Sequence, residues 1–200
     1  MNSFTTICSE PSIISEGKTI ALIGTGNIMF HDEGVGIYLT KYIQENYHIP
    51  ANLTVLDGGG LGFTLMTYYQ EYDKVIVVGT TSKEGKAGDI FVTSGDEMMA
   101  EGAIKKTATE VEITMMLEIC SFHEDMGEVA LISMIPEDII EVKNGVTPTV
   151  LNAMPKLRDL ILDELEQDGI TLEPKEGGMS FEEVVEFFAN PKNVDPRAFI

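Results

Sequence analysis

The sequence predicts an α/β fold: a three-layer sandwich in which a largely parallel twisted sheet of about five strands carries helices on both faces. Short apolar runs of strand length alternate with amphipathic stretches of helical length along most of the chain. The run Val75–Val78 is β-branched and wholly apolar, which is typical of a strand buried on both faces of a parallel sheet. Strands that alternate with helices favour parallel pairing through helical crossovers.

The first half of the chain begins with a strand, a turn and a helix. The helix is indicated by the apolar residues Val35, Ile37, Leu39 and Ile43, and it ends before Pro50 because the residue preceding a proline disfavours helical backbone. The expected elements of this half are, in order, a strand over 19–23, a helix over 34–47, a strand over 53–56, a helix over 61–69 and a strand over 74–78.

The second half continues the alternation. Residues 89–93 alternate between polar and apolar side chains, as is typical of an edge strand. The further expected elements are a short helix over 96–102, a longer helix over 108–120, a last strand over 129–135 and a last long helix over 149–167.

The chain is expected to hold one domain with two appendages. Residues 1–17 form a loose arm, 18–170 the α/β domain, and 171–200 a linker with a helical extension. A helix over 180–189 carries an apolar side that includes Phe181 and Phe188. That side either packs on its own domain or docks a partner.

Composition narrows the class of partner. With 33 acidic and 13 basic residues, the 200-residue chain has a formal charge of −20, so nucleic acid and anionic membranes are poor partners. A basic protein segment or a metal cation suits it better. Cys8 and Cys120 form no metal-ligand spacing, which favours a reducing cytoplasm. We expect no signal peptide and no membrane insertion, because no apolar run has the required length.

The turn after the first strand is the first candidate site, because ligands of open α/β sheets bind at the carboxyl ends of strands. It contains Gly24 and Gly26, as a dinucleotide-binding loop does, but Met29 occupies the third glycine position. No Lys or Arg lies between residues 20 and 37 to balance phosphate charge, so a nucleotide site is disfavoured. Asp32 and Glu33 would also suit the first turn of a helix, where carboxylates are favoured by the helix dipole.

Four stretches follow one another along the chain: Gly24–Ile28 with Asp32–Gly36, then Leu56–Gly59, Ile135–Glu137 and Gly145–Thr149. In this order they resemble the hydrogenase maturation endopeptidase family, whose members trim the C-terminal extension of the nickel-iron hydrogenase large subunit. The resemblance covers about residues 18–170. The resemblance implies the same α/β sandwich.

The resemblance also implies a metal-binding triad, which family members use to bind the nickel already held by the large subunit. Carried over residue by residue, Glu33 occupies the first position and is a metal contact. Gly79 stands where the family has Asp, and Thr109 stands where it has His. Glycine offers no side chain and a threonine hydroxyl is a poor ligand, so the inherited site is degraded. The cofactor that the resemblance implies is substrate-borne nickel, or none.

Other polar residues could replace the lost ligands. His31 and Glu110, with Glu112, are possible substitutes, and Asp57 ends a strand at the same edge of the sheet. Each also has a purely structural interpretation: a solvated loop residue for His31, a wet helix face for Glu110 and Glu112, and a cap of the glycine turn for Asp57.

The sequence therefore predicts a hydrogenase maturation endopeptidase-like protein whose partner is the nickel-iron hydrogenase large subunit. In this hypothesis Glu33 and Asp57 are the catalytic candidates, Glu33 as metal contact and Asp57 in the groove that binds the peptide. The alternative is a non-catalytic maturation chaperone or inactive paralogue that binds the subunit without cutting it, since Gly79 and Thr109 replace two family ligands.

Overall fold

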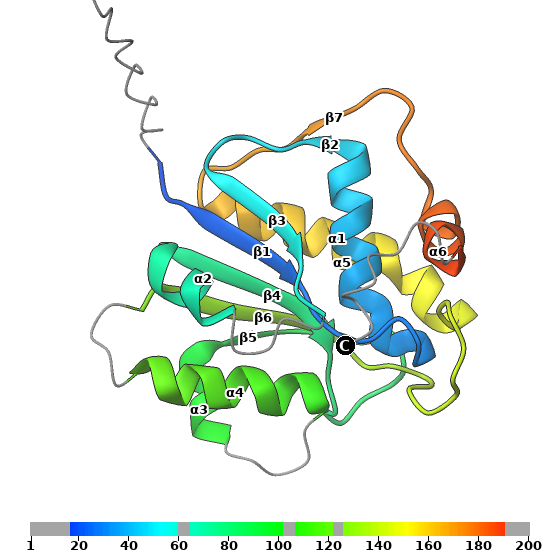
Figure 1. The fold of residues 1–200 in the computed structure, drawn as a ribbon, viewed down its shortest axis with the longest axis horizontal. Coiled ribbons are helices and arrows are strands. Elements are labelled where there is room, and N and C mark those ends of the chain that lie inside the picture. The colour runs from blue at the N-terminus through cyan, green and yellow to red at the C-terminus, as the bar shows by residue number, and fades with distance from the viewer. Residues whose placement is uncertain (1–16, 60–64, 102–106, 122–125, 191–200) are drawn as a thin grey trace, which may run out of the picture.

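The computed structural model describes residues 17–59, 65–101, 107–121 and 126–190 (Figure 1). The predicted arm, apart from Gly17, lies outside these residues, as does Cys8. Of the helix predicted over 61–69, residues 61–64 also lie outside them.

Five strands form one sheet in the order β3-β1-β4-β6-β5. Strands β3, β1, β4 and β6 are parallel, and β5 pairs with β6 in the antiparallel sense at the sheet edge. The strands are β1 Ile20–Gly24, β3 Leu53–Asp57, β4 Lys74–Thr80, β5 Ile90–Ser94 and β6 Glu128–Met134. The predicted largely parallel sheet, with 89–93 at its edge, is confirmed.

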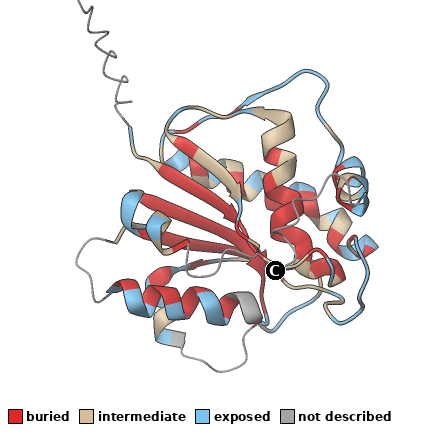
Figure 2. Ribbon diagram, viewed as in Figure 1, coloured by how far each residue is buried: buried red, intermediate tan, exposed pale blue. Residues whose placement is uncertain are grey.

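Helices cover both faces of the sheet (Figure 1). One face carries α1 Val35–Asn46, α5 Pro148–Gln167 and α6 Phe181–Ala189. The other carries α2 Met66–Glu71, α3 Gly95–Glu101 and α4 Ala108–Ser121. The central strands β1, β4 and β6 are buried along most of their length (Figure 2), which explains their continuous apolar sequence.

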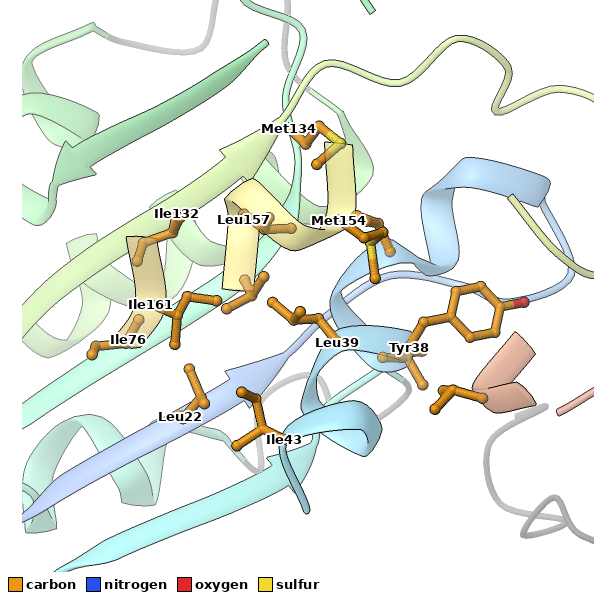
Figure 3. Packing of buried hydrophobic residues seen from close by; sticks show 14 of the residues in the cluster. Leu22, Tyr38, Leu39, Ile43, Ile76, Ile132, Met134, Met154, Leu157 and Ile161 are labelled. Carbon is orange, nitrogen blue, oxygen red and sulfur yellow. The ribbon is translucent and has the colours of Figure 1, made fainter. Parts of the chain in front are cut away.

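Two separate hydrophobic clusters result, one on each face of the sheet. Figure 3 shows the first, where strand residues such as Leu22 and Ile132 meet Leu39 of α1 and Leu157 of α5. Because side chains of a strand alternate between faces, neighbouring residues such as Leu22 and Ile23 belong to different clusters.

Two features were not predicted. A 3₁₀ helix, η1, spans His31–Gly34 immediately before α1. A two-stranded antiparallel pair joins β2, Tyr47–His48, to β7, Glu173–Pro174. Strands of two residues are too short to leave a periodic pattern in the sequence.

The C-terminal helix α6 packs on α1 and α5. Ser180 begins it with a capping box that includes Glu183. Phe181 stacks on Tyr42 with ring centroids 3.8 Å apart, and Phe188 meets Tyr38 edge to face at 5.5 Å. This packing favours the interpretation that the apolar side of α6 covers its own domain.

A partly buried ion cluster, with the buried Lys74 at its centre, lies at the start of β4. The Lys74 ammonium contacts Asp168 at 2.6 Å and Glu164 at 2.7 Å, and Lys18 contacts Asp168 at 2.8 Å. Burial alone would lower the pKa of Lys74, but hydrogen bonds to Asp168 and Glu164 outweigh it, so this pKa is raised. Among the described helices, none has both the length and the apolar character needed to cross a membrane.

Candidate active site

The turn after β1 is fixed by close backbone contacts. Gly26 has a φ of +124°, and a Cβ atom there would lie 1.8 Å from the Glu33 carbonyl oxygen. A Cβ on Gly36 would lie 2.2 Å from the carbonyl oxygen of Val78 in β4. Both contacts require glycine, so η1 and the start of α1 lie directly against the ends of β1 and β4.

Glu33 lines a cavity of about 260 Å³ at this end of the sheet. Its side chain is half-buried, and burial raises the pKa of its carboxyl group. The glycine turn after β3 and helix α4 form other parts of the wall. The described lining residues are Thr25, Gly26, Asn27, Phe30, Glu33, Gly58, Gly59, Leu65, Glu112, Ile113 and Met116.

The lining combines two carboxylates with apolar side chains and bare backbone. Glu33 comes from η1, and the exposed Glu112 comes from α4. Gly58 and Gly59 leave part of the wall without side chains, which allows an extended peptide to approach closely. The cavity can therefore accept a peptide segment and provide negative charge to a cation or a basic group.

Asp32, the neighbour of Glu33, points the opposite way and is fully buried. Its carboxylate accepts hydrogen bonds from the backbone N–H groups of Glu137, Asp138 and Thr147, and from the Thr147 hydroxyl. Sequence reasoning missed this role, because the donors lie more than a hundred residues away. The available signal was that the later family-like stretches, Ile135–Glu137 and Gly145–Thr149, contain two of these donor residues, Glu137 and Thr147.

Asp57 shapes the glycine turn. Its side chain is exposed, and Oδ1 accepts the N–H of Gly59 at 2.9 Å. Among the described residues, Gly58 and Gly59 line the cavity, whereas Asp57 itself is not in the lining. The structure thus places Asp57 at the expected edge, paired in register with Gly24, as a support of the cavity wall.

Glu110 is buried at the start of α4 rather than on a wet helix face. One carboxylate oxygen accepts the Thr81 hydroxyl at 2.5 Å, and the other accepts the Thr107 N–H at 2.8 Å. The Thr107 hydroxyl in turn accepts the Glu110 N–H at 3.2 Å, which completes a capping box. Glu110 therefore joins α4 to the end of β4.

Gly79 and Thr109, the two positions at which the resemblance implied lost family ligands, lie at the same end of the sheet. Gly79 is buried in β4 opposite Ser133 of β6. Thr109 lies in the first turn of α4, and its side chain is outside the described part of the structure. The contact between Thr81 and Glu110 places that turn beside the end of β4.

His31 lies apart from the cavity although it is only two residues from Glu33. It adopts a φ of +48°, and its Nδ1 atom faces Asp138 Oδ2 at 4.0 Å. Among the described lining residues of the cavity, no imidazole joins Glu33 and Glu112. A resident cation held by two carboxylates and a histidine therefore does not fit these lining residues.

Comparison with known proteins identifies the family of this chain. Residues 37–164 match the family model described as hydrogenase maturation protease, HycI. The hydrogenase 2 maturation protease of Escherichia coli K12 is 26% identical over 159 residues, which cover 78% of this chain and 96% of that protein. The hydrogenase expression/formation protein HupD of Bradyrhizobium diazoefficiens is 28% identical over 162 residues, covering 79% of this chain and 83% of that protein. The solved structure of the hydrogenase maturating endopeptidase HybD from E. coli matches with a TM-score of 0.73 at 25% identity, covering 78% of this chain and 98% of that one.

Proposed function

This chain belongs to the hydrogenase maturation protease family, and we propose that it recognises the large subunit of a nickel-iron hydrogenase and cleaves its C-terminal extension. The observation that carries this proposal is the position of Glu33. Its half-buried carboxyl group lines a cavity whose wall includes the bare glycine backbone of residues 58 and 59. A peptide and a metal-bearing end of the subunit would meet at such a place.

In this proposal the residues of the cavity have three different roles. Glu33 and Glu112 supply negative charge toward substrate-borne nickel, and Asp57 holds the glycine turn against which the peptide lies. The apolar side chains of Leu65, Ile113 and Met116 exclude water from part of the cavity. Exclusion of water strengthens each charge interaction made there.

A non-catalytic maturation chaperone is the second candidate function. Gly79 supports it, because a glycine in β4 offers no ligand where the family has Asp. In this case Glu33 would still contact the metal-bearing subunit, and the subunit would leave at its original length.

Mass spectrometry of the large subunit distinguishes the two functions. A nickel-loaded precursor subunit, incubated with the full chain, should lose the mass of its C-terminal extension, and Glu33→Gln should abolish that loss. The matched control is Glu84→Gln, an exposed acid in the loop after β4, which should cleave like the parent chain. Copurification with an unchanged mass would favour the chaperone. The absence of both binding and cleavage would contradict both functions.

We also propose a cytoplasmic location. The free, buried thiol of Cys120 suits a reducing compartment.

A further inference from the structure

We propose that His31, Asp138 and Glu141 form a binding site for a divalent transition-metal ion, separate from the Glu33 cavity. One nitrogen or oxygen atom from each of these side chains lies within 4.8 Å of the others. The three residues come from η1 and from the loop between β6 and α5. This site is independent of the proposed protease activity.

The buried imidazole of His31 is the main evidence. Its side chain is only 9% exposed, and its Nδ1 atom has no hydrogen-bond partner. A buried polar atom without a partner is unfavourable, so such an atom calls for an explanation. The Nδ1 atom faces Asp138 Oδ2 at 4.0 Å, and a tetrahedral metal ion about 2.0–2.2 Å from each ligand would draw these two atoms together to about 3.4 Å.

Hydrogen bonds fix the orientation of the Asp138 carboxylate toward His31. Its Oδ1 atom accepts the N–H groups of Ile140 at 2.8 Å and Glu141 at 3.1 Å, while Oδ2 faces His31. The Asp138 backbone is fixed as well, because its N–H donates to Asp32 and its carbonyl oxygen accepts the Asp32 N–H. The buried Asp32 therefore connects the two segments that carry the ligands, as outer-shell residues do in known metal sites.

The ligand set indicates the class of metal. One imidazole nitrogen and two carboxylate oxygens suit a borderline ion such as Zn²⁺ or Ni²⁺, whereas Ca²⁺ and Mg²⁺ prefer oxygen ligands throughout. Three protein ligands leave a fourth tetrahedral position for water. Glu141 is exposed, so the ion has a path of entry from solvent.

Zn²⁺ titration of the purified, metal-free full chain by calorimetry tests the site. The affinity should fall at least about tenfold in His31→Asn and in Glu141→Gln. Asn is chosen at position 31 because it tolerates a positive φ better than most residues. Glu137→Gln and His48→Asn are matched controls and should bind as the parent chain does. Glu33→Gln reports separately on the cavity. Equal affinity in all variants, a loss of Zn²⁺ affinity confined to Glu33→Gln, or no binding by the parent chain would overturn the proposal.

Nitrogen NMR of the histidine rings provides a second measurement that needs no variant. The chain has three histidines, so each ring can be assigned. One equivalent of Zn²⁺ should shift the Nδ1 resonance of His31 and leave His48 unchanged. A shift at another histidine instead, or no shift at all, would contradict the assignment. Neither experiment depends on cleavage, so failure of the protease proposal would leave both readouts interpretable.

Discussion

Asp32 and Thr147, 115 residues apart in sequence, are joined by two hydrogen bonds to one buried carboxylate. The Thr147 N–H donates to Oδ1 at 2.6 Å, and its hydroxyl donates to Oδ2 at 3.0 Å. Thr147 is also the N-cap residue of α5. The turn that carries Glu33 is therefore attached to the start of the longest described helix of the domain.

Asp32→Asn should destabilise the protein strongly. The amide cannot accept the hydrogen bonds made to both oxygens, so buried N–H donors lose their partner. We expect the free energy of unfolding to fall by about 3 kcal/mol or more in urea titrations. Glu137→Gln, whose side chain is exposed next to the same donors, should change it by less than about 0.5 kcal/mol. Similar values for the two variants would show that Asp32 does not hold the turn.

Glu33→Gln should remove activity without reducing stability. Burial raises the pKa of Glu33, so its ionised form is less favourable in the folded state than in the unfolded chain. The variant should gain stability relative to the parent as pH rises from 4 to 7, because only the parent has a carboxyl group at position 33 that ionises in this range. Urea unfolding at both pH values measures the difference. A variant that becomes relatively less stable with rising pH would contradict this cause.

Glu110→Gln tests whether this residue acts as a cap or as a ligand. Loss of charge-assisted bonds from Thr81 and Thr107 should lower the free energy of unfolding by about 1–3 kcal/mol. Binding of the large subunit, measured by copurification, should persist if the role is structural. Glu118→Gln, exposed on the same helix, should leave both properties unchanged. Unchanged stability with lost binding would assign Glu110 to the site.

Lys74→Met should lower the free energy of unfolding at neutral pH, and this free energy should then fall less as the pH is lowered. Despite burial, hydrogen bonds from Lys18 and Lys74 lower the pKa of Asp168 below 3.8. A lowered carboxyl pKa contributes stability above about pH 3.8, and this contribution is lost as pH falls through the folded-state pKa. The variant should lose about 2 kcal/mol or more at pH 7 and less at pH 3. Lys156→Met, exposed on α5, is the control, and an equal loss at both pH values would contradict this linkage.

Phe188→Ala tests whether α6 is an integral part of the domain. Phe188 is 8% exposed and belongs to the cluster that contains Leu22 and Ile76. Truncating a buried phenylalanine costs about 3–5 kcal/mol of stability. Thermal unfolding should show a single transition at a lower temperature. Glu186→Ala on the exposed side of α6 is the control, and a stability unchanged by Phe188→Ala would indicate that α6 is dispensable.

Strongly apolar elements could be predicted from sequence, because burial on both faces leaves an unmistakable run such as Val75–Val78. The edge position of β5 followed from its alternating residues. The 3₁₀ helix could not be predicted, since Asp32 and Glu33 also suit an ordinary helix start. Its geometry depends on donors from the loop that precedes α5.

For the candidate site, too, some features could be predicted from the sequence and others could not. The place of Glu33 at the end of β1 followed from the glycine turn, whose spacing is local. Which of the adjacent carboxylates faces the cavity was decided by partners of Asp32 more than a hundred residues away. The burial of Glu110 likewise depends on Thr81, which belongs to a different part of the chain.

The close approach of Gly26 to the Glu33 carbonyl means that a main-chain contact, and not neighbouring side chains, fixes the backbone position of Glu33. Leu65, Ile113 and Met116 line the same cavity from the hydrophobic core, so a change in their size would alter the cavity without moving the main chain that carries Glu33.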